Sequence, residues 1–333
     1  MSADRLNQPA RLEATLHAVL EVLAGVGTNT AAAQAGLEPA DLDAAVAIYQ
    51  QAGQRALAQQ AGPPAWRQLY VQFTNWNKAE QTAADHIAPV LDLAQQDGMI
   101  TGWWFIRKHP CWRMRLLPAP GTQLPPTLAD TLDELTVDGR VHRWWPGIYE
   151  PEAAAFGGDT SMTIAHTLFH ADSRAVLATG HGELGRRELS LLLCATLMRA
   201  AGLEWYEQGD VWHRVTRERP LPPDVPAAKV HAMAGSLRQL LLADTSPTGP
   251  MLQSDRTLKP AADWVRAFRH AGRDLGAAAR DGTLERGLRE VISYHVIFHW
   301  NRIGLHARAQ SVLAHAARSA ILHPADSMER PLP

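Results

Sequence analysis

The order of two hydrophobic periodicities along the chain constrains its fold more than any other feature. Segments in the first half alternate apolar and polar residues as strands do; they are residues 69–73, 103–108, 112–117 and 141–145. Later apolar residues recur at helical spacing, over about 160–178, 186–202, 228–243, 258–280, 284–303 and 307–321. One further helix is predicted among the strands, over residues 78–97, with a kink at Pro89. Because the other helices follow the strands, the sequence predicts an α+β fold, with a mixed sheet from the first half packed against many helices.

Residues 1–62 predict a separate, small helical extension with a helix-turn-helix outline. A stripe of apolar residues from Leu12 to Leu23 has helical spacing, and Pro39 suits the first turn of a later helix. The segment Gly62-Pro63-Pro64 has the composition of a linker. We therefore expect a second, larger domain over residues 65–333.

Charge argues against the DNA-binding function that such an outline would otherwise suggest. Residues 11–50 contain a single basic residue, Arg11, against Glu13, Glu21, Glu38, Asp41 and Asp43. A DNA-binding helix needs a cationic face. The whole chain has 32 Lys and Arg against 34 Asp and Glu, so we expect neither nucleic acid nor an anionic membrane as a partner.

Cysteine usage and apolar content predict a soluble protein of the cytoplasm. The two cysteines, Cys111 and Cys194, are far apart in the sequence, which fits a reducing compartment better than a disulfide scaffold. No apolar stretch approaches the length of a membrane span, and the first residues do not resemble a signal peptide. A homodimer is compatible with these features.

No segment predicts a bound cofactor or metal ion. Gly180 to Gly185 match the G-x-G-x-x-G fingerprint, but the residues before them have the pattern of a helix and not of the required strand. We expect a glycine-rich connection between helices there. His295 and His299 stand four residues apart without the glutamate or cysteine partners of a zinc site, so we expect no cofactor and no metal.

A predicted hairpin carries three arginines. Strand alternation places Arg113 and Arg115 on one face, and Arg107 on the neighbouring strand is positioned to join them. Guanidinium groups this close repel one another unless carboxylates or carbonyls lie among them. Two interpretations follow, namely ion pairs with Glu150 or Glu152, or a clamp for a peptide or carboxylate.

Tryptophan is unusually frequent, with 11 residues against 6 phenylalanines and 5 tyrosines. The pairs Trp103-Trp104 and Trp144-Trp145 are the most unusual part of this pattern. Because aromatic side chains bury large areas, these pairs predict either core packing or the wall of a cleft for a flat, heterocycle-rich ligand.

A predicted helix near the C-terminus carries polar residues within an apolar run. His295, His299 and Arg302 fall on one stripe of this helix, and Ser293 and Tyr294 lie on adjacent stripes. A single buried histidine is usually a hydrogen-bonded core residue. Two histidines with a tyrosine and an arginine support a proton-transfer site equally well.

Six short motifs occur in a fixed order along the chain. They are Phe105-Ile106-Arg107, Arg113-x-Arg115, Tyr149-Glu150-Pro151-Glu152, Phe156-Gly157-Gly158, Phe169-His170-x-Asp172-Ser173 and His299-Trp300-Asn301-Arg302-x-Gly304. The ordered set resembles the elimination domain of class I lanthipeptide dehydratases, and in particular its stand-alone branch in thiopeptide biosynthesis. The resemblance covers about residues 65–320 and implies an elimination-domain-like catalytic domain there.

One departure from this family's pattern bears on the reaction. The resemblance implies that the elimination enzymes remove glutamate from glutamylated Ser or Thr with the help of an arginine just before the Phe-Gly-Gly motif. This chain keeps Arg113, Arg115, His299 and the acidic Glu152, but it has Ala155 at that arginine position. Alanine cannot bind the leaving carboxylate, so the resemblance implies the branch that reuses the scaffold, the pyridine synthases.

In that branch the resemblance implies a formal four-plus-two cycloaddition between two dehydroalanines. The substrate is a modified precursor peptide with a leader segment. One dehydroalanine and the carbonyl before it must first become an iminol, which requires proton transfer. Loss of water and of the leader then produces a pyridine-centred macrocycle, and none of these steps requires a cofactor.

The resemblance and the residue chemistry together suggest roles. Tyr294 and His299 are the predicted proton-transfer groups, and Ser293 is a predicted hydrogen-bond donor. The predicted substrate-binding residues are Arg107, Arg113, Arg115, Glu152, Arg302, Trp104 and Trp145. Two alternatives remain open, the glutamate-eliminating half of a split dehydratase and a non-catalytic partner that binds the leader peptide.

Overall fold

The computed structural model describes residues 8–60, 66–178, 185–252 and 258–322. The chain divides into two compact units, Met1–Ala65 and Trp66–Pro333, and each is described by itself. The predicted linker Gly62-Pro63-Pro64, and all but the last residue of the segment Gly180 to Gly185, lie outside the described residues.

The N-terminal unit is a bundle of three helices. Its helices are α1 (Gln8–Leu23), α2 (Thr28–Ala35) and α3 (Pro39–Gln60). Small side chains such as Ala18, Ala31 and Ala32 form its core with Val19 and Leu42, so the helices approach one another closely. The helical spacing of the leucines in α1 is confirmed, but Leu12, Leu16, Leu20 and Leu23 lie on its exposed face.

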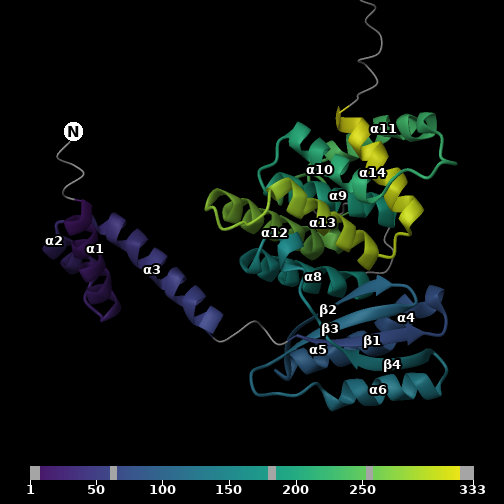
Figure 1. Ribbon diagram of the computed structural model, residues 1–333, viewed down its shortest axis with the longest axis horizontal. Helices are drawn as coiled ribbons and strands as arrows, with labels where there is room; N and C mark the ends of the chain where they lie inside the picture. The colour runs from purple at the N-terminus through teal and green to yellow at the C-terminus, as the bar shows by residue number, and fades with distance from the viewer. Residues whose placement is uncertain (1–7, 61–65, 179–184, 253–257, 323–333) are drawn as a thin grey trace, which may run out of the picture. The chain divides into compact units, whose positions relative to one another are not determined.

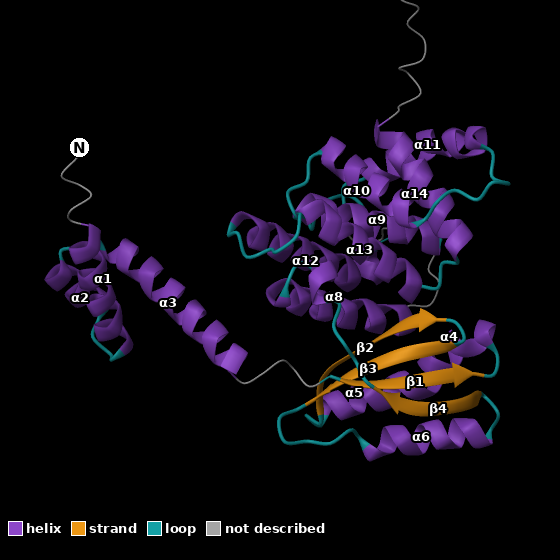
Figure 2. Cartoon of the chain, viewed as in Figure 1, coloured by secondary structure: helices purple, strands orange, loops and turns teal. Residues whose placement is uncertain are grey.

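The larger unit contains one four-stranded sheet (Figures 1 and 2). The strands are β1 (Arg67–Phe73), β2 (Ile100–Lys108), β3 (Cys111–Pro118) and β4 (Val141–Gly147), in the spatial order β2-β3-β1-β4. The four predicted strands and the α+β class are confirmed. Each pairing in this sheet is antiparallel, so the described sheet is antiparallel and not mixed as predicted.

One face of the sheet packs against short helices that connect its strands. These helices are α4 (Ala79–Thr82), α5 (Ala88–Gln96) and α6 (Pro126–Val137), and their apolar residues join those of the sheet in the main core. The kink expected at Pro89 takes the form of a π-helical turn, Ala83–Ile87, directly before the first turn of α5. Proline is tolerated in a first helical turn because the N–H it lacks would have no acceptor there.

Seven longer helices form a second layer on the β2 side of the sheet (Figure 1). They are α8 (Asp159–Ala178), α9 (Arg186–Ala200), α10 (Trp205–Glu218), α11 (Ala227–Leu242), α12 (Ala262–Arg280), α13 (Leu288–Arg302) and α14 (Ala307–Leu322). Six of these were predicted, whereas α10 was not. None of the described helices is long and apolar enough to cross a membrane.

The outer edge of β2 is covered by side chains from the helical layer. The Phe105 N–H donates to Ser173 Oγ at 3.1 Å, and Arg302 Nε donates to the Phe105 carbonyl at 3.0 Å. Nδ1 of His170 lies 2.7 Å from the carbonyl oxygen of Trp103. These contacts give backbone groups of an edge strand partners from α8 and α13.

Two glycines between the short helix α7 (Ala153–Phe156) and α8 make a tight connection. Gly157 and Gly158 have φ values of 86° and 97°, a region that other residues rarely adopt. A Cβ atom on Gly158 would also lie 2.5 Å from the Glu285 side chain. The two glycines of the Phe156-Gly157-Gly158 motif are therefore required by the backbone of this connection, which leads directly into α8.

Candidate active site

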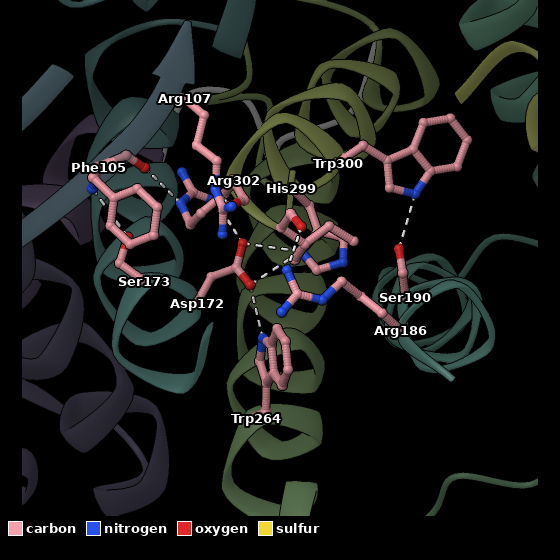
Figure 3. Close-up of polar contacts among 11 residues, drawn as sticks. Phe105, Arg107, Asp172, Ser173, Arg186, Ser190, Trp264, His299, Trp300 and Arg302 are labelled. Carbon is pink, nitrogen blue, oxygen red and sulfur yellow. Dashed lines mark hydrogen bonds and ion pairs between the residues drawn. The ribbon is translucent and has the colours of Figure 1, made fainter. Parts of the chain in front are cut away.

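A buried carboxylate, Asp172, joins three helices at the centre of the helical layer (Figure 3). Its oxygens lie 3.0 Å from Nδ1 of His299, and it accepts from Arg302 Nη1 at 2.5 Å and from Trp264 Nε1 at 2.8 Å. Burial alone would raise the pKa of Asp172, but its interactions with His299 and Arg302 lower that pKa below its ordinary value. The aspartate is therefore ionised and holds both α13 side chains in place.

This network leaves two buried nitrogen atoms unused. Nε2 of His299 and Nη2 of Arg302 have no hydrogen-bond partner among the described residues. Because Asp172 engages Nδ1, a neutral His299 ring presents Nε2 as an acceptor. His299 is only 1% exposed and packs against Phe268 at a ring distance of 5.0 Å. Its position suits proton transfer only to a group that enters this apolar layer.

Arg115 on β3 is a buried cation that forms no ion pair with any described residue. It is 4% exposed, and its guanidinium lies over the rings of Trp104 at 4.3 Å and Tyr149 at 5.1 Å. Its Nη1 donates weakly to the Arg113 carbonyl at 3.4 Å, and its Nε has no partner among the described residues. Burial lowers the pKa of Arg115 to about 10, so it stays charged at neutral pH. Such a group is suited to bind a carbonyl or carboxylate.

A hydrogen-bonded pair of neutral groups lies beside this arginine. The Tyr149 hydroxyl is 2.8 Å from Nε2 of His166, and the His166 ring lies 4.7 Å from that of Trp66. Burial, and then the charge of Arg115, lower the pKa of His166 to about 4, while burial raises the pKa of Tyr149. Phenol and imidazole are both uncharged at neutral pH, and this pair can pass a proton.

Neither member of this pair was predicted as a site residue. Tyr149 opens the motif Tyr149-Glu150-Pro151-Glu152, so its position carried a signal. His166 lies on α8 outside every quoted motif, and nothing in its local sequence distinguishes it from other half-buried histidines. Only the packing of α8 beside the segment after β4 brings His166 to Tyr149.

An aromatic cluster packs beside Arg115 and the Tyr149–His166 pair. It is built from Trp104, Ile106, Phe156, Met162, Ala165 and Phe169, and bordered by Trp66, Tyr149, Ala153, Ala155, Tyr294 and Phe298. The predicted proton-transfer residue Tyr294 therefore faces the same cluster as Trp104. His295 packs against Phe156 at 4.9 Å, and neither of its ring nitrogens has a described partner.

Arg113 and Trp145 lie on the same sheet face, one row away from Arg115. The rings of Tyr70 and Trp145 stack at 5.2 Å, and Arg113 lies over Tyr70 at 5.7 Å. Glu152 is exposed, yet near enough for its charge to raise the pKa of Arg115. These three predicted substrate-binding residues therefore border the buried part of the site and do not line it.

Arg107 lies elsewhere, and the prediction that it joins the other two arginines is wrong. It is paired across the hairpin with Trp112, on the opposite face from Arg113. It forms an ion pair with Glu80, and its Nε donates to the Arg302 carbonyl at 2.7 Å. Arg107 thus caps the end of α13. No ion pair with Glu150 or Glu152 occurs for these arginines among the described residues.

Ser293 is separated from the predicted substrate-binding residue Arg302. It precedes Arg302 by nine positions, which places the two on opposite sides of α13. Its Oγ donates to the Glu290 carbonyl at 2.6 Å. The hydroxyl is therefore engaged within its own helix.

Comparison with known proteins identifies the fold. The tRNA-dependent lantibiotic dehydratase MibB from Microbispora sp. 107891 aligns with a TM-score of 0.58 and 21% identity, over 81% of this chain and 29% of MibB. TsrL aligns with a TM-score of 0.55 and 15% identity, over 80% of this chain and 100% of TsrL. The pyridine synthase TbtD from thiomuracin biosynthesis aligns with a TM-score of 0.49 and 14% identity, over 77% of this chain and 97% of TbtD.

No curated protein matches the sequence. The chain spans less than a third of the length of MibB, and the likenesses to MibB and TsrL show the fold alone. The family model described as the C-terminal part of lantibiotic biosynthesis dehydratases matches residues 66–321, nearly the whole of the larger unit. This chain therefore belongs to the lantibiotic dehydratase C-terminal family.

Proposed function

We propose that this protein is a pyridine synthase that joins two dehydroalanines of a modified, leader-bearing peptide by a formal four-plus-two cycloaddition. Water and the leader are then lost, and a pyridine-centred macrocycle remains. The proposal goes beyond family membership, because the same family contains dehydratase domains. It rests on the residues around Arg115.

The observation that carries the proposal is the combination of Arg115, a buried arginine that forms no ion pair with a described residue, a neutral proton-transfer pair and an alanine. Arg115 and the Tyr149–His166 pair border one aromatic cluster, and Ala155 borders it at the position where the elimination enzymes carry an arginine. Iminol formation needs a polarised carbonyl and a proton moved from nitrogen to oxygen. It needs no second cation to hold a leaving glutamate.

The parts suit this reaction in the following way. The Arg115 guanidinium polarises the carbonyl that precedes one dehydroalanine. Tyr149 gives its proton to that carbonyl oxygen. His166, which is neutral at pH 7, takes the proton from the amide nitrogen and passes it to the Tyr149 oxygen. The aromatic cluster holds the flat azoles and alkenes face to face, and such orientation can lower the barrier by about 7–11 kcal/mol.

Mass spectrometry of the full-length protein with an azole-modified, leader-bearing peptide containing two dehydroalanines tests the proposal. We expect loss of water, release of the leader as a carboxamide, and a cyclic pyridine product. An unchanged peptide that nevertheless binds tightly would replace the proposal with a non-catalytic leader-binding role. A peptide that neither binds nor reacts would overturn both.

Glutamate elimination is the second candidate, and one observation favours it. Arg115 is buried and makes no ion pair within the part of the chain that the structure describes, so it is available to bind the carboxylate of a leaving glutamate. A glutamylated peptide offered to the same protein separates the two functions. Release of free glutamate with formation of dehydroalanine would identify the chain as the elimination half of a split dehydratase.

A further inference from the structure

The sheet face that carries Arg115 continues past the buried site, over β3, β1 and β4. Arg113 on β3, Tyr70 on β1 and Trp145 on β4 are paired across the strands and form one row. Arg143 lies two positions before Trp145 on β4, and its guanidinium lies over the Trp145 ring. The first three side chains are half-buried and Arg143 is exposed. We call the surface formed by Tyr70, Arg113, Arg143 and Trp145 the basic sheet face.

No strand of this sheet contains an aspartate or a glutamate. Arg107, on the opposite face, is ion-paired with Glu80. The basic side chains on the face of Arg115 have no such partner within the described part of the chain. These side chains are Lys108, Arg113, Arg115 and Arg143.

Carboxylates from outside the strands do not balance these charges. Glu150 and Glu152 follow β4, and the charge of Glu152 acts on Arg115, at the buried end of this face. Helix α6 packs on the opposite face, where its Asp133 accepts from Trp144 Nε1 at 2.8 Å. Even when both glutamates are counted, basic side chains on this face outnumber them, so it keeps an excess of positive charge.

Arg113 and Arg143 are close enough to act on the same group. Burial raises the pKa of the Cys111 thiol, and the charges of Arg143 and then Arg113 oppose that rise. Cys111 is on β3, two positions before Arg113, and so belongs to the same face. An anion bound there is therefore attracted by two guanidinium groups at once.

The aromatic rings fix these arginines and are themselves covered. The rings of Tyr70 and Trp145 are stacked at 5.2 Å with an interplanar angle of 13°. Arg113 lies over Tyr70 at 5.7 Å, and Arg143 over Trp145 at 4.7 Å. A Cβ atom on Gly147 would lie 2.3 Å from Tyr70 Cε2, so the Tyr70 ring rests directly on β4. The groups left to bind a ligand are guanidinium N–H donors and not free ring faces.

We propose that the basic sheet face binds acidic side chains of the peptide substrate, in a segment that lies next to the reacting one. Carboxylates accept from the guanidiniums of Arg113 and Arg143, one row away from Arg115. A single-stranded nucleic acid is also anionic, but its bases need free aromatic faces on which to stack. The proposal rests on the proposed function in one respect, that the ligand is the peptide substrate.

Fluorescence anisotropy with the full-length protein tests this surface. The probes are a fluorescein-labelled, glutamate-rich peptide, its counterpart with glutamine at the same positions, and a labelled oligothymidylate. We expect the glutamate peptide to bind most tightly, with a preference that shrinks as salt is added. Arg113→Gln combined with Arg143→Gln should weaken its binding by about tenfold or more. Arg187→Gln combined with Arg217→Gln is the matched control, since these arginines are exposed on α9 and α10.

A charge reversal separates loss of binding from a folding defect. Arg143→Glu, at an exposed position, should reduce the affinity for the glutamate peptide and raise the affinity for a lysine-rich counterpart, which a misfolded protein would not do. Equal affinities for the glutamate and glutamine peptides, equal effects of the two double variants, or tightest binding of the oligothymidylate would each overturn the proposal.

Turnover is measured separately on the dehydroalanine-containing peptide. Cyclisation by a protein that shows no preference for glutamate removes only the role of the basic sheet face. A preference for glutamate that depends on Arg113 and Arg143, without cyclisation, removes only the proposed reaction.

Discussion

Nδ1 of His299 lies 3.0 Å from both carboxylate oxygens of Asp172. The same carboxylate accepts from Arg302, so one aspartate on α8 sets the orientation of two α13 side chains. Asp172 is fully buried, and water cannot replace it. The orientation of the His299 and Arg302 side chains therefore depends on one carboxylate.

Replacing that charge should destabilise the fold strongly. Asp172→Asn leaves Arg302 buried without a counter-ion, and we expect the free energy of unfolding in urea to fall by about 3–5 kcal/mol. Asp263→Asn is the control, because its ion pair with Arg266 is exposed and should contribute less than about 1 kcal/mol. Equal losses in the two variants would mean that Asp172 carries no such role.

Arg115 should be required for turnover but not for stability. Arg115→Leu removes a buried cation that is not ion-paired to a described residue, so we expect the free energy of unfolding to stay constant or rise. The pyridine-forming rate should fall by roughly a hundredfold or more, as when one preorganised donor is lost. Arg67→Leu, on an exposed position of β1, should leave the rate unchanged. A stable Arg115→Leu enzyme with full turnover would remove Arg115 from the site.

Two tyrosines compete for the role of proton donor, and phenylalanine variants distinguish them. Tyr149 is hydrogen bonded to His166, whereas Tyr294 lies beneath the Arg286 guanidinium at 5.1 Å. We expect Tyr149→Phe to lower turnover by roughly a hundredfold or more, and Tyr294→Phe to lower it less. The reverse order would favour the assignment made from the sequence, with Tyr294 and His299 as the proton-transfer groups.

His295 should make the protein sensitive to acid. Burial, and then the charge of Arg302, lower the pKa of His295 to about 3 in the folded state. Above pH 6.5 the ring is neutral in both states and contributes no pH dependence. Below it only the unfolded chain binds a proton, so stability falls with pH, by roughly 2 kcal/mol between pH 6.5 and 5.

His295→Leu should remove the contribution of His295 to this slope and so reduce it, while the contribution of His166, whose pKa is also lowered by burial, remains. No stability should be lost at pH 7, because neither ring nitrogen of His295 has a described partner. Urea unfolding at pH 7 and pH 5 measures the effect. His142→Gln, at an exposed position of β4, should keep the wild-type slope. If His295→Leu keeps it as well, other buried histidines such as His166 account for the acid sensitivity.

Glu80 should stabilise the end of α13 through two arginines. It pairs with Arg107 and with Arg186, and these donate to the carbonyls of Arg302 and Ile303. Burial opposes ionisation, but the two arginines lower the pKa of Glu80 from 4.5 to about 2. The stabilisation is complete above pH 4.5 and is lost as the pH falls towards 2.

At pH 7 we therefore expect Glu80→Gln to cost roughly 3 kcal/mol of unfolding free energy. The control is Glu134→Gln on the exposed face of α6, which should have little effect. The difference between Glu80→Gln and wild type should shrink when unfolding is measured at pH 3. A difference that is the same at both pH values would show that charge is not the cause.

The sequence predicts elements best where an apolar pattern is continuous. The four strands and most helices of the larger unit have such a pattern, and they lie where it indicates. Helix α10 was missed because its apolar positions, chiefly Val211, Trp212 and Val215, are few among polar residues. The sheet face of Arg107 was predicted wrongly for a different reason. The turn at His109-Pro110 pairs Lys108 with Cys111. The length of the turn sets this register, and the alternation of apolar and polar residues alone does not reveal it.

The candidate site was only partly predictable. The motif residues Arg115, His299 and Arg302 are buried, and each packs against aromatic rings, as a functional interpretation requires. Their pairing is not encoded locally, because Asp172 and His166 come from α8 and reach their partners only through packing. The sequence likewise does not reveal which side-chain nitrogen atoms of the site remain without a described hydrogen-bond partner, because this depends on how the helices and the sheet pack together.

The covered edge of β2 limits how a peptide can approach the sheet. An exposed edge strand is a template on which an extended peptide can add a further strand. With the backbone of Phe105 already bonded to Ser173 and Arg302, that mode of recognition is closed at β2. The opposite edge, β4, contains Pro146, which has no N–H to donate. Extension of the sheet by an added strand, whether from a peptide or from a second copy of the protein, is therefore blocked at Phe105 of β2 and has one donor fewer at β4.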